Sequence, residues 1–233
     1  MRVEQEQGSS VAAIIDKVAV VGFGVCWSLL LFAFVVSAGP VAALGWLLAL
    51  ALPSVLTVDL AAGLVHWFAD TFLTPRTPWV GPTVIQSFRE HHLDPAALAR
   101  RDAVEASGQN CLVCLPLLAG ALWAGAVGPV SPGLLAGLIW FTFGIAATNR
   151  FHQWAHADAV PGWVATLQRG GWILSPEKHA RHHAGAHDRA YCVTTGWLNP
   201  LLDAVRFFGR LEGSIRWLGS RRRARFARSL RSD

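Results

Sequence analysis

This sequence carries little charge, since only 15% of its 233 residues are Asp, Glu, Lys or Arg. Soluble domains usually carry about 25%, and the mean hydropathy here is +0.38. The chain is therefore too apolar for an ordinary water-soluble enzyme. A disordered protein is excluded as well, because disordered chains are poor in aromatic residues and this one has 11 Trp and 12 Phe. The length fits one domain.

Cysteines and several common catalytic motifs are also scarce or missing. Four cysteines give no disulfide framework, and the pair Cys111 and Cys114 opens an apolar stretch, where we expect a packing role. The sequence contains no HExxH, GxSxG or GxGxxG motif. Support is therefore lacking for a zinc protease of that type, an α/β-hydrolase or a dinucleotide-binding enzyme. No cleaved signal peptide is recognisable.

Charged side chains are missing from two long stretches, the 41 residues 18–58 and the 39 residues 111–149. A helix needs about 20 apolar residues to cross a bilayer, so each stretch is long enough to cross twice. Gly and Pro near positions 39 and 129 predict a turn in the middle of each. We therefore predict an all-α integral membrane bundle rather than buried helices of a soluble protein. Its four transmembrane helices are expected at 18–38, 41–65, 111–129 and 133–151.

The basic residues predict the orientation of this bundle. All 20 Lys and Arg lie within 1–17, 66–110 or 150–233, and neither turn contains one. The positive-inside rule then places both termini and the 66–110 segment in the cytoplasm. The membrane itself is expected to be a bacterial inner membrane. The arginine-rich segment 221–228 fits anionic lipid better than nucleic acid.

The expected organisation is a single membrane domain, 1–233, with a cytoplasmic helical cap that carries a histidine-rich dimetal site. Its segments are a cytoplasmic N-terminus (1–17), a first transmembrane hairpin (18–65), a cytoplasmic histidine segment (66–110), a second transmembrane hairpin (111–151), and a cytoplasmic histidine segment with a basic tail (152–233).

Nine histidines occur, and each falls in a segment that we expect to be cytoplasmic. His152 and His156 are four residues apart, so on a helix they share one face, about 6 Å apart along the axis. A zinc ion takes three or four protein ligands, so this many imidazoles predicts a site for two ions. Imidazole suits iron, copper and zinc, and a two-iron site is the best chemical interpretation. The predicted metal ligands are His66, His91, His92, His152, His156, His179, His182, His183 and His187.

Two aspartates accompany the first histidine. Asp59, His66 and Asp70 are seven and four residues apart, so on a helix all three share a face. Asp59 lies within the membrane stretch, where an ionisable group is functional by default, and we predict catalytic roles for Asp59 and Asp70. For Asp59 the alternative stays open: a buried hydrogen-bonding residue that orients His66.

Five segments resemble, in order, motifs of the plasmanylethanolamine desaturase family: GLVHWFAD at 63–70, FREHHLDP at 88–95, HQWAH at 152–156, HARHH at 179–183 and YCVTTGWLN at 191–199. The resemblance covers 59–203. It implies conversion of the O-alkyl chain of a plasmanyl ether phospholipid to the cis vinyl ether of a plasmalogen. It also implies that the histidines other than His187 are those the family requires, while His187 and Asp70 occupy further family positions. Ala103, Ser107 and Ala186 depart from the family pattern, which affects the loops rather than the ligands.

The resemblance also implies partners: an ether phospholipid from the bilayer, O2, and two iron ions. The chain has no flavin, haem or iron–sulfur motif, so we expect electrons from a separate reduced carrier, a cytochrome b5-like protein or a ferredoxin. Basic residues would attract an acidic carrier. Nucleic acid is not an expected partner.

Two alternatives remain open. An acyl-chain desaturase of a phospholipid such as phosphatidylglycerol would share the same histidines. A metal-binding membrane protein without enzymatic activity is the other alternative. Transporters place ionisable ligands near the bilayer midplane, whereas the histidines here lie at helix ends or beyond, which favours an enzyme.

Overall fold

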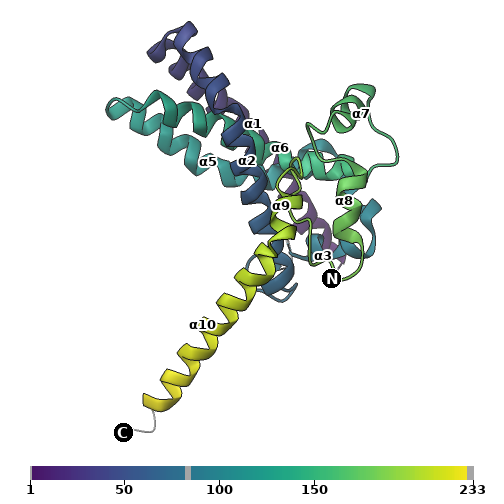
Figure 1. The fold of residues 1–233 in the computed structure, drawn as a ribbon. Helices are drawn as coiled ribbons and strands as arrows, with labels where there is room; N and C mark the ends of the chain where they lie inside the picture. Colours follow the sequence, from purple (N-terminus) through teal and green to yellow (C-terminus); the bar gives the residue numbers. More distant parts are fainter. Residues whose placement is uncertain (1, 82–84, 230–233) are drawn as a thin grey trace.

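The computed structural model describes residues 2–81 and 85–229, and within these ranges the fold is helical without strands (Figure 1). Four of the described helices are long and apolar enough to cross a membrane. This confirms the predicted all-α membrane bundle. The four are α1 (Arg2–Ala38), α2 (Pro40–Phe72), α5 (Ala103–Val127) and α6 (Pro132–Ala155).

Both predicted turns separate these helices into hairpins. Gly39 has φ 78°, a left-handed conformation that glycine adopts without a steric penalty. Pro40 follows at the first position of α2, where a missing N–H costs nothing. The second turn lies between Val127 and Pro132, and Pro132 again opens a helix.

The helices extend beyond the apolar stretches that predicted them. Helix α2 continues to Phe72 and α6 to Ala155, so the first and fourth histidines lie on helix ends. Helix α5 begins eight residues before the predicted position 111 because the Asp102 carboxylate accepts hydrogen bonds from the backbone N–H groups of Val104 and Glu105. Such an N-cap starts a helix whatever the polarity of its first turns.

The bundle core is small and apolar. Helix α1 packs mainly on α5, α2 on α6, and α5 on α6. Phe34 and Leu118 are fully buried between them. Cys111 and Cys114 are buried too, and the Cys114 thiol lies 3.5 Å from the carbonyl oxygen of Thr142, so both cysteines pack as expected. The outer faces leave large apolar side chains exposed, as lipid-facing surfaces do.

Shorter helices gather at the end of the bundle where α2 and α6 terminate (Figure 1). Helix α10 leaves this cap sideways, across the direction of the long helices (Figure 1). It exposes Trp217 and Leu218, and the Arg221 guanidinium lies 4.0 Å from the centre of the Trp217 ring. The remaining helices are α3 (Gln86–Leu93), α4 (Pro95–Ala99), α7 (Gly162–Arg169), α8 (Pro176–His183), α9 (Asn199–Ala204) and α10 (Phe207–Ser229).

Candidate metal centre

Helix ends bring the histidines together. Helix α2 carries His66 six residues before its last residue, and α6 carries His152 in its last turn. Helix α8 begins at a Ser175 cap whose hydroxyl accepts from the backbone N–H of Lys178, followed by Pro176. The three histidines of α8 are spaced i, i+3 and i+4, so they share one face. Those of α3, His91 and His92, are adjacent in sequence, and His156 is the residue at which α6 ends.

The first group of imidazoles, which we call the α6–α8 cluster, comprises His91, His152, His156, His179 and His183. Their ligand atoms all lie within 4.8 Å of one another. The Nε2 atom of His179 is 2.8 Å from that of His152, 2.9 Å from that of His156 and 3.0 Å from that of His183. A single nitrogen holds at most one proton, so these atoms converge on a common centre in a way that hydrogen bonding alone does not explain.

The second group, the Asp70 cluster, comprises His66, His91, His92 and His182, again within 4.8 Å. Oδ2 of Asp70 lies 3.3 Å from Nε2 of His66 and 3.6 Å from Nε2 of both His92 and His182. The Asp70 side chain is only 7% exposed, and no hydrogen bond to either of its oxygens is found among the described residues. Because His91 belongs to both groups, the two clusters adjoin.

Backbone carbonyl groups orient two members of the Asp70 cluster. Nδ1 of His66 lies 3.2 Å from the carbonyl oxygen of Tyr191, and Nδ1 of His182 lies 2.8 Å from that of Arg189. An Nδ1–H that donates to a carbonyl fixes the tautomer and leaves Nε2 with a free lone pair. Both rings therefore present the nitrogen that a metal ion needs.

Burial keeps five of the imidazoles neutral, those of His92, His156, His179, His182 and His183. It is the main cause that lowers the pKa of His92, His156 and His183 to about 4, and neighbouring imidazoles lower it further. The same causes lower the pKa of His179 and His182 even more. At neutral pH all five are therefore uncharged, the form in which histidine binds metal.

The residues present fit a metal centre. The two groups hold only imidazole nitrogens, and the Asp70 carboxylate lies against the second group. Such a donor set, without a thiolate, suits divalent transition metals such as iron, copper or zinc. A buried carboxylate without hydrogen bonds is costly unless a cation compensates it, and Asp70 is in that position.

Asp59 lies elsewhere. Its side chain is fully buried, and its Oδ1 accepts from the backbone N–H groups of Thr195 at 2.9 Å and Gly196 at 3.0 Å. Its Oδ2 accepts from Leu198 at 3.2 Å. Asp59 therefore anchors the loop 190–198, and the catalytic role predicted for it gains no support from this geometry.

His187 is also placed apart from the two clusters. Its backbone has φ 55°, and its ring stacks on that of His92 with 4.4 Å between centroids. Neither group of ligand atoms found in the described part of the chain includes it. The geometry supports a packing contact rather than the ligand role predicted for this residue.

Two supporting residues, Asn199 and Arg89, were not predicted from the sequence. The Asn199 side chain accepts from the N–H of Cys192 and donates to its carbonyl oxygen, both at 2.9 Å. Arg89 donates to the carbonyl oxygens of Asp70 at 2.7 Å and Leu73 at 3.0 Å, which closes the end of α2. Their positions inside the motifs, one in the loop motif and one two residues before His91, were the available hints.

An apolar helix bundle with adjoining imidazole clusters at one end defines an integral membrane protein with a histidine-rich metal site. The sequence profile described as "Lipid desaturase domain" matches residues 55–225, and the chain belongs to this family. The matched range contains all nine histidines. No solved structure matches the chain.

Named relatives agree with the family. The chain is 40% identical over 178 residues to the plasmanylethanolamine desaturase of Myxococcus xanthus, which covers 76% of this chain and 63% of that protein. It is 41% identical over 169 residues to plasmanylethanolamine desaturase 1 of Mus musculus, covering 70% and 62%. Fatty acid desaturase 4, chloroplastic, of Arabidopsis thaliana is 32% identical over 157 residues, covering 66% and 47%. The chain thus spans less than two thirds of the length of these relatives, and the family resemblance is confirmed.

Proposed function

We propose that this protein is a membrane lipid desaturase that introduces the cis vinyl-ether double bond of plasmalogens into plasmanylethanolamine. The observation that carries the proposal is the pair of adjoining imidazole clusters at one end of an apolar bundle, inside the matched segment. The chain is 40% and 41% identical to two proteins named for this activity, which supports plasmanylethanolamine as the substrate.

We assign one iron ion to each cluster. His152, His156, His179 and His183 would hold one ion, while His66, His92, His182 and Asp70 would hold the other, with His91 adjoining both. Iron bound there would supply the O2-dependent removal of hydrogen from an unactivated C–H bond, which acid–base side chains do not achieve.

The overall reaction balances with an external reductant. The –O–CH2–CH2– segment becomes –O–CH=CH– and loses two hydrogen atoms. One O2 accepts these together with two electrons and two protons, and two water molecules form. The electrons come from a separate reduced carrier, a cytochrome b5-like protein or a ferredoxin, because the sequence has no redox-cofactor motif.

The protein's own side chains supply the environment. Five of the histidines are buried, namely His66, His91, His152, His179 and His182. Near the end of α2, an apolar groove of about 430 Å³ is lined by side chains that include Val65, Phe68 and Ile85. This groove suits an alkyl chain entering from the bilayer, with the oxidised carbons at the level of the clusters.

We propose a location in a bacterial inner membrane. The distribution of Lys and Arg supports an orientation with both termini and the histidines on the cytoplasmic side. An electron carrier from the cytoplasm would then have direct access to the cap.

Lipid analysis tests this function. The full chain is expressed in a plasmalogen-free host fed an alkyl-ether lipid, beside His183→Ala at matched membrane content. We expect vinyl ethers from the wild type only. A new double bond in an acyl chain of phosphatidylglycerol would favour the acyl-desaturase alternative, and no new double bond at all would contradict the proposal.

A further inference from the structure

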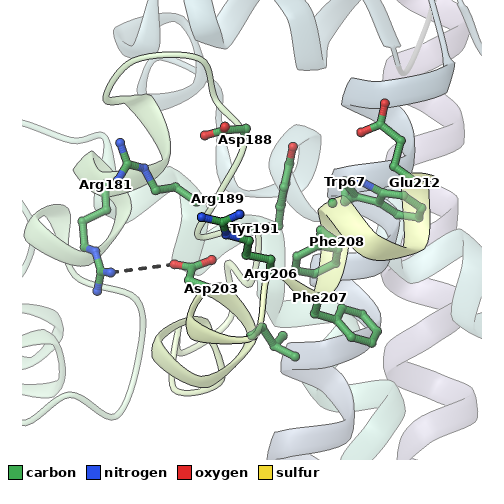
Figure 2. A pocket seen from close by; sticks show the side chains of 12 residues that line it. Trp67, Arg181, Asp188, Arg189, Tyr191, Asp203, Arg206, Phe207, Phe208 and Glu212 are labelled. Carbon is green, nitrogen blue, oxygen red and sulfur yellow. Dashed lines mark ion pairs between the residues drawn. The ribbon is translucent and has the colours of Figure 1, made fainter. Parts of the chain in front are cut away.

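A cavity of about 650 Å³ lies where α2 meets α8 and the start of α10 (Figure 2). Its two sides differ in chemistry. Figure 2 shows Trp67, Phe207 and Phe208 on one side and arginines on the other, with Tyr191 between them. The arginines are Arg181, Arg189 and Arg206.

The cavity wall is also the wall of the metal centre. The carbonyl oxygen of Tyr191 lies 3.2 Å from His66, and the Tyr191 ring centroid lies 5.2 Å from that of His182. The carbonyl of Arg189 lies 2.8 Å from Nδ1 of His182. A molecule in the cavity is therefore separated from the Asp70 cluster by a single layer of residues.

The charges in the cavity are not all paired with one another. Arg181 lies 3.7 Å from Asp203, and Glu212 pairs with Arg216 at 2.7 Å. The guanidinium groups of Arg189 and Arg206 have no ion pair or side-chain hydrogen bond within the described ranges, and neither has the Asp188 carboxylate. Two free guanidinium groups match a phosphate, and a free carboxylate matches an ammonium group.

The backbone around the cavity is held in an unusual conformation. Ala190 has φ 55° and Arg206 has φ 49°, a region that residues other than glycine seldom occupy. The Asp203 carboxylate accepts a hydrogen bond from the Ala190 N–H at 3.1 Å and so holds Ala190 in this conformation. Such conformations concentrate at ligand sites.

We propose that this cavity binds the phosphoethanolamine head group of the ether phospholipid. Arg189 and Arg206 bind the phosphate, Asp188 binds the ammonium group, and the aromatic side contacts the glycerol backbone and the chains. This inference rests on the proposed function. Only the glycerol backbone separates the phosphate from the first two carbons of the O-alkyl chain, so a head-group site has to adjoin the metal centre, as this cavity does.

Equilibrium binding tests the phosphate contact without turnover. Full-length protein in detergent is dialysed against a radiolabelled short-chain ether phosphatidylethanolamine. We expect Arg206→Gln and Arg189→Gln each to weaken binding by about tenfold, the loss of one charge-assisted hydrogen-bonding group. Arg210→Gln is the matched control, because Arg210 lies one turn further along α10 and does not line the cavity.

The ammonium contact has a separate test. Asp188→Asn should bring the affinity for the ethanolamine lipid down toward that for its choline analogue, which has no N–H to donate. Phosphatidylglycerol, which lacks the ammonium group, should bind Asp188→Asn at least as well as it binds the wild type.

Unchanged affinity in Arg189→Gln and Arg206→Gln, or an equal loss in Arg210→Gln, overturns the head-group site. Thermal melting identifies a variant that fails to fold, and the other arginine variant then decides. If the wild type forms vinyl ethers but all variants bind the lipid equally well, only the head-group site is contradicted. Arginine-dependent binding without vinyl-ether formation removes the proposed function instead.

Discussion

At the scale of single residues, Asp70 differs from the histidines around it. One of its oxygens lies within 3.6 Å of three imidazole nitrogens from three different helices. A carboxylate in that position gives the Asp70 cluster a negative charge that the α6–α8 cluster lacks. The two ions would therefore have unequal surroundings.

Asp70→Asn should lower the iron content from about two ions per chain to about one, because the Asp70 cluster loses its anionic ligand. Elemental analysis of purified protein measures this. Asp94→Asn is the control, since Asp94 is exposed and pairs with Arg100. His187→Ala should keep both ions because its ring lies outside the clusters. Retention of both ions by Asp70→Asn would contradict the assignment.

Asp59→Asn should destabilise the protein by about 1–3 kcal/mol, because an amide nitrogen replaces an oxygen that accepts backbone hydrogen bonds. The melting temperature and the iron content should both fall, since the anchored loop orients His66 through the Tyr191 carbonyl. Lost activity with unchanged melting and unchanged iron would instead support the catalytic role that the sequence predicts.

At the scale of elements, the end of α2 and the loop 190–199 are fitted closely. A Cβ added at Gly63 would lie 2.7 Å from the Cys192 thiol and 3.3 Å from its backbone nitrogen. That loop carries the Tyr191 carbonyl group that contacts His66, and its backbone N–H groups donate to the Asp59 carboxylate. Helix α2 therefore positions the loop in two ways. Gly63 lets the loop approach closely because it has no side chain, and the Asp59 carboxylate accepts hydrogen bonds from the loop.

Gly63→Ala should push the loop away from α2, and we expect lower iron content together with a lower melting temperature. Gly45→Ala is the matched control on the same helix, because a Cβ there meets nothing within 4 Å. It should be neutral or stabilising by up to about 1 kcal/mol from helix propensity. Equal behaviour of the two variants would show that the close approach is unimportant.

At the scale of the whole molecule, both hairpin turns lie at the end of the bundle away from the histidines. The four membrane helices thus separate an apolar, uncharged end from a cap that is rich in arginine and histidine. This polarity is the basis for the orientation that we propose.

Reporter fusions measure the orientation directly. Alkaline phosphatase, which is active only outside the cytoplasm, should be active when inserted in the turn 128–131 and inactive when fused after residue 233. The physical reason is the absence of Lys and Arg from both turns. Activity at the C-terminal fusion would reverse the orientation and place the metal centre on the opposite side.

The four helices and their turns could be predicted from the residues alone, because helix length, apolarity and Gly–Pro breaks are local properties. The histidine motifs likewise supplied the candidate metal ligands. The tertiary structure alone decided how those residues divide. It placed His91 between two clusters, turned Asp59 toward a loop and left His187 stacked outside. These outcomes depend on contacts such as that between His66 and Tyr191, which are 125 residues apart in the chain. No spacing rule reaches that far, because such contacts are set by the packing of whole helices and loops.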